Sequence, residues 1–157
     1  MSDTERNYKL MRTIHEHRDR VAFYLNQIVR ELLERSLNHD ESKFGPEEFP
    51  VYAKAIDKFE THHFGTPGYV EAKNSIASAT KHHYEHNRHH PEHYSDGIAG
   101  MDLVDLIEML CDWKAATLNH KDVPGNMAKS MEFGIRQYKI SPQLAKVLYN
   151  TIQNYRL

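Results

Sequence analysis

The sequence predicts an all-α protein, and two patterns carry that prediction. Apolar residues return at steps of three and four positions in several stretches, as they do along one face of an α-helix. No segment alternates apolar and polar residues for long enough to indicate a half-buried strand. The 157 residues show no internal repeat and no low-complexity linker. We therefore expect a single domain over residues 1–157, built as a bundle of about five to seven helices.

The composition limits the class of protein and its partners. A hydrophobic fraction of 39% and a charged fraction of 27% are typical of a globular protein. A formal net charge of -2 gives no reason to expect nucleic acid or an anionic membrane as a partner. Cys111 is the only cysteine, which excludes an intrachain disulfide and a thiolate zinc site. With a polar N-terminus and no apolar run of about 20 residues, we expect a cytoplasmic protein without a membrane span.

Residues 3–36 are expected to form one long helix or two helices in line. The apolar stripe of this stretch comprises Ile14, Val21, Tyr24, Leu25, Ile28 and Leu32. His17 occupies the vacant place in this stripe, between Ile14 and Val21. Because an unpaired polar group is costly to bury, His17 is either a core histidine with one hydrogen bond or a metal ligand.

A helix end or short turn is expected over residues 37–46, where His39 and Asp40 are adjacent and Gly45-Pro46 follows. An N-cap role is the alternative for Asp40 or Ser42. The next helix should begin near Pro46, with two glutamates in its first turn, and continue to about Phe59.

A histidine-rich helix is expected after the loop at residues 61–68. Six of the twelve histidines lie between Thr80 and Tyr94. The buried face begins with apolar residues and continues in phase with histidines: Tyr69, Ala72, Ile76, Ala79, His83, His86 and His90. Pro91 should end this helix, because the residue before a proline is pushed out of the helical region.

A further helix is expected over residues 101–118. One face is apolar, with Leu103, Leu106, Leu110 and Trp113, and another is acidic, with Asp105, Glu108 and Asp112. Residues 119–126, which include Pro124 and Gly125, should form a turn before two last helices, at 127–138 and 141–155. These two helices should pack on a metal-site core of about residues 14–113. Tyr149 and Tyr155 are either residues at the edge of the core or contacts of a homodimer.

The order of the polar residues, first His, then His-Asp, then further histidines, then Asp, resembles the HD-domain superfamily of metal-dependent phosphohydrolases. His17 is followed at the matching offset by Val21-Ala22, and His39-Asp40 is followed by Lys43, as in the pattern H-D-x-x-K. The resemblance covers about residues 14–113. It implies a helical fold and an enzyme that hydrolyses phosphoesters.

A second resemblance is to a bacterial and phage family without an assigned reaction. Its motifs are similar to H-D-x-S-K-F, H-H-x-x-H-N-x-H-H-P-E and E-M-L-x-D-W, which match residues 39–44, 82–92 and 108–113. This likeness indicates which residues matter but not which reaction they perform.

Together the residues and the resemblances predict a centre of imidazoles and carboxylates, suited to one or two ions of Mn, Fe, Co, Ni or Zn. The expected metal ligands are His17, His39, Asp40, His82, His83, His90 and Asp112. The expected catalytic residues are Lys43 and His86, and the substrate contacts are Lys43, Asn87, Arg88 and His89. Asp105 and Glu108 have a secondary role, either supporting the ligands or pairing with a neighbouring helix. The expected partner is a small phosphorylated substrate such as a nucleotide.

Two other interpretations belong to different classes. In the first, the protein is a non-catalytic module that binds a metal or a nucleotide, for example a phage-type inhibitor or sequestering protein. In the second, it binds anions through protonated histidines alone, in which case affinity would be lost above about pH 7.

Overall fold

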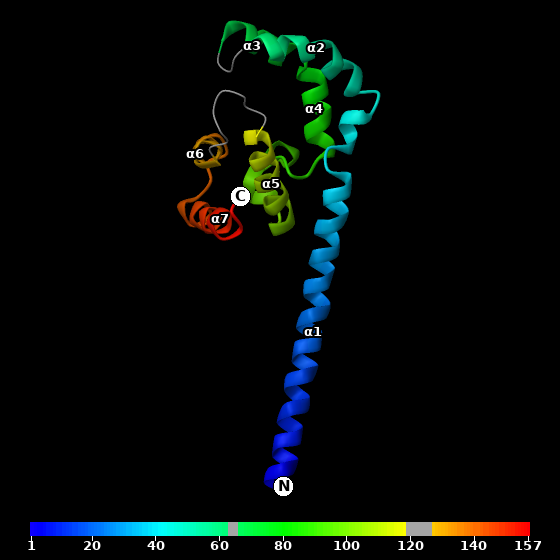
Figure 1. Cartoon of the computed structure of the whole chain (residues 1–157), viewed down its shortest axis with the longest axis vertical. Helices are drawn as coiled ribbons and strands as arrows, with labels where there is room; N and C mark the ends of the chain where they lie inside the picture. Colours follow the sequence, from blue (N-terminus) through cyan, green and yellow to red (C-terminus); the bar gives the residue numbers. More distant parts are fainter. Residues whose placement is uncertain (63–65, 119–126) are drawn as a thin grey trace. The chain divides into compact units, whose positions relative to one another are not determined.

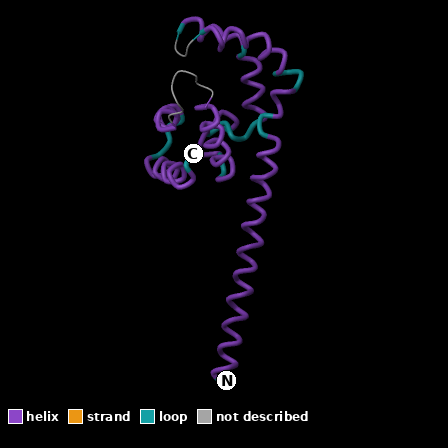
Figure 2. Tube along the Cα trace, in the orientation of Figure 1, coloured by secondary structure: helices purple, strands orange, loops and turns teal. Residues whose placement is uncertain are grey.

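The computed structural model describes residues 1–62, 66–118 and 127–157, and it confirms the all-α prediction. Within these ranges there are seven α-helices and no strand (Figure 2). The expected turn at residues 119–126, and His63, lie outside the described residues. The chain divides into two compact units, Met1–Leu37 and Asn38–Leu157. The first unit is part of a single helix that has no buried residue. All the buried core residues of the described chain therefore belong to the second unit.

The first unit is formed by α1 (Asp3–Asn38), an unbroken helix coloured blue to cyan in Figure 1. Its first turn carries Asp3 and Glu5, and its last turn carries Arg35, as the helix dipole favours. None of its residues is buried. The stripe that includes His17 is therefore exposed rather than part of a core, because this unit holds no second element against which it could pack. Among the described residues, no helix, α1 included, has both the length and the apolar character to cross a membrane.

Near the start of the second unit, Asp40 has an unusual backbone conformation. The backbone of Asp40 has φ 59° and ψ 17°, the left-handed conformation that aspartate tolerates better than most residues. A 3-10 turn, η1 (Glu41–Phe44), follows, and α2 (Phe49–Thr61) comes after it. Asp40 stands at the N-cap position of η1, but its side chain makes no capping hydrogen bond, so the capping alternative is wrong for this residue.

The predicted histidine-rich helix is two helices, α3 (Pro67–Ser75) and α4 (Ala77–His86), interrupted at Ile76. Ile76 has φ -106° and ψ 8°, outside the α-helical region. The helix also ends at His86 rather than at Pro91. Asn87 is extended, and its side-chain amide donates to the carbonyl oxygen of His83 at 2.7 Å, which replaces a main-chain hydrogen bond at the helix end.

Two 3-10 turns, η2 (Pro91–His93) and η3 (Gly97–Gly100), lead into α5 (Leu103–Leu118). A buried carboxylate, that of Asp105, ties this segment to α5. It accepts a hydrogen bond from the hydroxyl of Tyr94 at 2.6 Å and pairs with Arg88 at 3.2 Å. Leu103 was expected on the apolar face but is exposed, since the buried face of α5 begins at Asp105 and Leu106.

The hydrophobic core lies where α5 meets α6 (Met127–Gln137) and α7 (Pro142–Tyr155). Its buried members are Leu110, Met127, Met131, Ile140, Ala145 and Leu148. Tyr149 packs at the edge of this core, as one of the two interpretations predicted, while Tyr155 is 75% exposed. Ser141 caps α7 by accepting from the backbone amide of Leu144, as its sequence position indicates.

Candidate metal centre

The carboxylate of Asp40 lies among three imidazole nitrogens contributed by different segments. His39 Nε2 is 3.5 Å from Oδ2, while His83 Nε2 and His89 Nε2 are 3.2 Å and 3.5 Å from Oδ1. His83 is on α4, and His89 lies in the turn between α4 and η2. The left-handed backbone of Asp40 and the early end of α4 thus bring the histidines and the carboxylate together.

Two of these atoms are buried and have no hydrogen-bond partner within the described part of the chain: Oδ1 of Asp40 and Nε2 of His89. A buried polar atom without a partner carries a desolvation cost, and such atoms are rare in folded proteins. Here a carboxylate oxygen and an imidazole nitrogen face each other at 3.5 Å. A cation placed between them would satisfy both atoms.

Six residues form the ligand set that we call the Asp40 cluster: His39, Asp40, His83, His89, His90 and Asp112. In one group, Asp40, His83, His89 and His90 each offer an atom within 4.8 Å of the others. In a second group, His39, Asp40 and Asp112 do the same. Asp40 belongs to both groups, so its carboxylate has the position of a shared ligand.

A third group, His39, His89 and Glu108, overlaps the other two. Glu108 Oε1 is 2.8 Å from Nδ1 of His39 and 3.2 Å from Nδ1 of His89. These contacts use the ring nitrogens that do not face Asp40. Glu108 thus lies behind the two imidazoles, which agrees with the expected secondary role of supporting the ligands.

The electrostatics of the cluster keep the carboxylates ionised. Burial alone would raise the pKa of Asp40, but the neighbouring His83 imidazole and the Lys43 ammonium hold it well below its usual range. Burial opposes ionisation of Asp112 as well, and the hydrogen bond from His39 lowers its pKa. Asp112, and then Glu108, raise the pKa of His39 to about 10 through hydrogen bonds.

His90 behaves in the opposite way. Burial, together with the neighbouring His89 and His83, lowers the pKa of His90 to about 3, so its ring is neutral at neutral pH. Its Nε2 lies 3.0 Å from Nε2 of His83. Neutral imidazole is the form that binds metal, and the Nε2 atoms of His90 and His83 are close enough to be ligands of one ion.

Lys43 lies on the other side of Asp40. Its ammonium donates to Oδ2 at 2.5 Å, whereas the orphaned Oδ1 faces His83 and His89. The two oxygens of Asp40 therefore have different surroundings: Oδ2 faces the Lys43 ammonium and His39, whereas Oδ1 faces only imidazoles. The ammonium group remains partly exposed, with a side-chain exposure of 44%.

Several predicted site residues are not in the cluster. His17 lies midway along α1, in the other unit, and its assignment as a ligand stays a prediction. His82 turns its Nδ1 to Glu48 at 2.8 Å, and its ring stacks on that of His86 at 4.0 Å. His86 was expected on the buried face but is exposed, because it lies in the last turn of α4 and donates from Nδ1 to the carbonyl oxygen of His82.

Two predicted substrate contacts have partners inside the protein. Arg88 donates to Asp102 at 3.0 Å and to Tyr94 at 3.1 Å, besides its pairing with Asp105. Both amide hydrogens of Asn87 are used, one by the carbonyl oxygen of His83 and one by Ser42 Oγ, each at 2.7 Å. These contacts position the segment that carries His89 and His90.

Sequence reasoning missed two features of this site. His89 was expected to contact substrate, but it is 2% exposed and belongs to the ligand groups. Glu48 was noted only as part of a helix start, yet it is 0% exposed and holds two histidines. A glutamate next to a helix N-terminus is usually explained by the helix dipole, so the sequence contains no separate signal for its burial.

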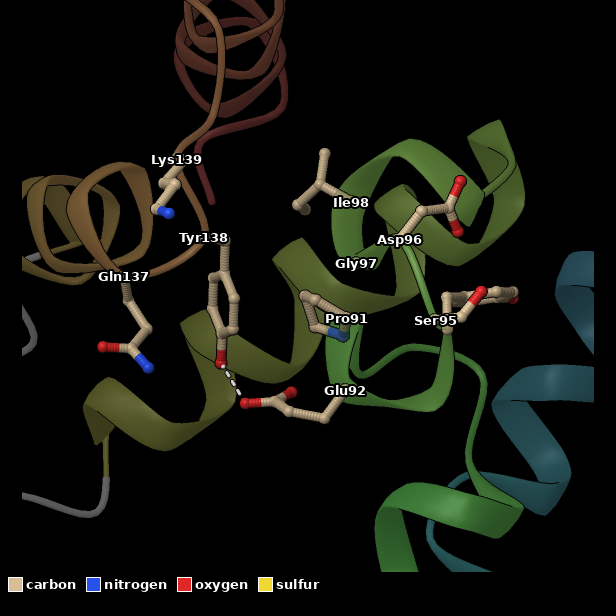
Figure 3. Close-up of a pocket in the computed structure, with 10 residues that line it drawn as sticks. Pro91, Glu92, Ser95, Asp96, Gly97, Ile98, Gln137, Tyr138 and Lys139 are labelled. Atoms are coloured by element: carbon tan, nitrogen blue, oxygen red, sulfur yellow. Dashed lines mark hydrogen bonds between the residues drawn. The ribbon is translucent and has the colours of Figure 1, made fainter.

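A pocket of about 470 Å³ lies close by in sequence, lined by residues 91–92, 94–98 and 137–139 (Figure 3). The figure shows the Tyr138 hydroxyl reaching Glu92, to which it donates at 3.1 Å. This bond ties η2 to the connection between α6 and α7. No member of the Asp40 cluster lines the pocket, so it forms no part of the candidate metal centre.

Comparison with known proteins defines the family. Residues 6–154 match a family of unknown function, DUF5662, and the chain therefore belongs to that family. Searches of curated proteins and of solved structures found no match. The family's description names no reaction, so the function has to be inferred from the side chains of the site.

Proposed function

We propose that this protein is a metal-dependent phosphohydrolase that acts on a nucleotide or another small phosphoester. The observation that carries the proposal is the pair of buried atoms without partners, Asp40 Oδ1 and His89 Nε2, within a group that includes His83 and His90. The resemblance to HD-domain phosphohydrolases, with His39-Asp40 and Asp112 in matching order, supports the same function.

The donor set decides which metals fit. Three imidazoles and a carboxylate form a borderline nitrogen and oxygen site, suited to Mn, Fe, Co, Ni or Zn rather than to Ca or Mg. Such a cation supplies Lewis-acid polarisation of a phosphoryl oxygen and a lowered pKa for a bound water. The group formed by His39, Asp40 and Asp112 offers a place for a second ion beside the first.

The residues around the cluster have separate tasks in this proposal. Asp40 neutralises part of the positive charge and holds the two groups together. Lys43 remains partly exposed while it pairs with Asp40, so its ammonium is available to attract a phosphate oxygen. Arg88 has no such task, because Asp102 and Asp105 already hold its guanidinium.

The test starts with metal analysis of protein purified without a histidine tag. We expect at least one tightly held transition metal per chain, and much less than one equivalent would contradict the proposal. A phosphate-release screen of nucleotides, cyclic nucleotides and simple phosphoesters then follows with added Mn, Co, Ni or Fe.

The variants Asp40→Ala and His89→Ala should abolish both the bound metal and phosphate release. His15→Ala, a histidine exposed on α1, is the matched control and should change neither. Activity that survives in Asp40→Ala would mean that another site or a contaminant is responsible. Stoichiometric metal without turnover across the panel would replace the proposal with a non-catalytic metal-binding module.

A further inference from the structure

We propose that Glu48 and Glu108 are positioning residues that hold His39, His83 and His89 with the proton on Nδ1. In the metal-bound centre each ring then has its Nε2 lone pair free to bind the ion beside Asp40. The inference rests on the metal centre of the proposed function and specifies how the protein prepares its ligands.

Glu48 acts from the N-terminal end of α2. Its carboxylate is fully buried, with Oε2 at 3.0 Å from Nδ1 of His83 and Oε1 at 2.8 Å from Nδ1 of His82. A carboxylate can only accept, so each of these ring nitrogens must donate a proton. Asn87 and Ser42 Oγ are also 3.1 Å from Nδ1 of His83, but both amide hydrogens of Asn87 are used elsewhere and the Ser42 hydroxyl hydrogen-bonds to Glu48. The proton of His83 is thereby placed on Nδ1, facing Glu48.

Glu108 acts in the same way from α5. A single oxygen, Oε1, lies 2.8 Å from Nδ1 of His39 and 3.2 Å from Nδ1 of His89. The Glu108 side chain is 14% exposed, so its environment is largely dry. In both histidines the opposite nitrogen, Nε2, lies 3.5 Å from a carboxylate oxygen of Asp40.

The two glutamates therefore share one geometric role. The nitrogens of an imidazole point in different directions, so a ring whose Nδ1 faces a glutamate is free to bind a cation only through Nε2. The group of His39, His89 and Glu108 is then a hydrogen-bonding arrangement rather than a separate metal position. A carboxylate behind a ligand histidine fixes the orientation of its ring and increases its basicity, and losing such a partner typically weakens metal binding by about 10–100-fold.

The experiment compares Glu48→Gln and Glu108→Gln with Glu47→Gln, which makes the same change at an exposed neighbour. Zinc affinity is measured by competition with a chromophoric chelator, and the thermal midpoint is measured on the metal-free protein. We expect each of the first two variants to bind zinc roughly 10–100-fold more weakly. Glu47→Gln should bind as the wild type does. Unchanged zinc affinity, with a lowered midpoint of the metal-free protein, would show a merely structural role and overturn the inference.

A second readout uses neither variants nor turnover. In zinc-loaded wild-type protein with ¹⁵N-labelled histidine, NMR of the rings should show a proton on Nδ1 and zinc on Nε2 for His39, His83 and His89. Zinc on Nδ1 at any of these three would overturn the inference for that residue. If this pattern is found while the phosphate-release screen fails, the hydrolase proposal is wrong and the inference stands. If no zinc binds at all, the inference is wrong, whereas the hydrolase proposal is decided separately by the metal analysis and the phosphate-release screen with Mn, Co, Ni or Fe.

Discussion

Asp40 combines an unusual backbone with an unusual side chain. Its left-handed conformation follows directly on the end of α1, and its two carboxylate oxygens face different neighbours. Asparagine has the same shape and tolerates the left-handed region equally well. The carboxylate can therefore be replaced by an amide without disturbing the backbone.

We expect Asp40→Asn to remain folded but to bind metal more weakly. The loss of affinity should be at least as large as the roughly 10–100-fold loss that is typical when the hydrogen-bond partner of a metal ligand is removed. The physical reason is the loss of a negative charge shared by both ligand groups. Metal retained after gel filtration, measured by elemental analysis, tests this expectation. Glu41→Gln, an exposed neighbour, should retain its metal. Full metal content in Asp40→Asn would remove Asp40 from the centre.

Tyr52 gives a pH dependence that is separate from the metal. Burial, and then the charge of Glu48, raise the pKa of Tyr52 to about 12. Because the folded protein holds this proton more tightly than the unfolded chain, the contribution to stability is complete below pH 10. It is lost as the pH rises from about 10 towards 12.

We expect the free energy of unfolding of metal-free wild-type protein to fall more steeply between pH 10 and 12 than that of Tyr52→Phe, because the variant has no phenol to ionise at that position. Urea denaturation at several pH values measures the two slopes. Tyr155→Phe, which changes a tyrosine that is 75% exposed, should keep the wild-type slope. Equal slopes for Tyr52→Phe and the wild type would show that Tyr52 is not the responsible group.

At the residue scale the sequence predicted much of the ligand set. His39, Asp40, His83, His90 and Asp112 were expected as ligands, and they lie within the Asp40 cluster. Their role as ligands remains a prediction. His89 was expected to contact substrate, and the buried phase predicted for a helix ending at Pro91 includes His83, His86 and His90 but not His89. The helix instead ends at His86, and Asn87 after it donates to Ser42, a residue distant in sequence, which no local pattern reveals.

The helices themselves show which local signals are dependable. The starts and ends of α6 and α7 agree with the expected ranges within two residues, since Ser141 and Pro142 mark the beginning of α7 clearly. The break at Ile76 has no proline or glycine beside it, so periodicity alone could not separate α3 from α4. Periodicity also identified the apolar stripe of α1 but could not say what, if anything, covers it.

The packing of α6 against α5 depends on a residue without a side chain. A Cβ added at Gly134 would lie 2.1 Å from Cη2 of Trp113, far inside van der Waals contact. The indole is rigid and stacks at 6.2 Å on the ring of Tyr138, so it cannot move aside without disturbing a second ring.

We expect Gly134→Ala to destabilise the protein by about 1–3 kcal/mol, the usual cost of overpacking, although alanine is the better helix former. Chemical denaturation of the metal-free protein measures the change. Glu132→Ala, at an exposed position on the same helix, is the control and should alter stability by about 0.5 kcal/mol at most. A Gly134→Ala variant as stable as the wild type would show that α5 and α6 can move apart at no cost.

For the whole molecule, the proposed centre links metal binding to folding. An ion that binds the folded state alone adds RT ln(1 + [L]/Kd) to the free energy of unfolding, which is about 2.7 kcal/mol at 100 times Kd. For a chain of this size that corresponds to a rise in thermal midpoint of roughly 5–10 °C. We expect excess zinc to raise the midpoint by about this amount and a chelator to reverse it, as followed by circular dichroism.

The same addition should raise the midpoint of Asp40→Asn much less than that of the wild type, because the variant lacks the shared carboxylate and binds the ion more weakly. A rise of equal size in Asp40→Asn would assign the stabilisation to other histidines on the surface.

The residues of the Asp40 cluster come from three distant stretches of the second unit: the turn at His39 and Asp40, the segment from His83 to His90, and α5. An ion held by all three would close two long loops at once, as a pair of cross-links does. Cross-links of long loops stabilise proteins by restricting the unfolded chain. With Cys111 as its only cysteine, this protein cannot form such links from sulfur. Its cross-link would withstand reductants and open only to chelators or acid.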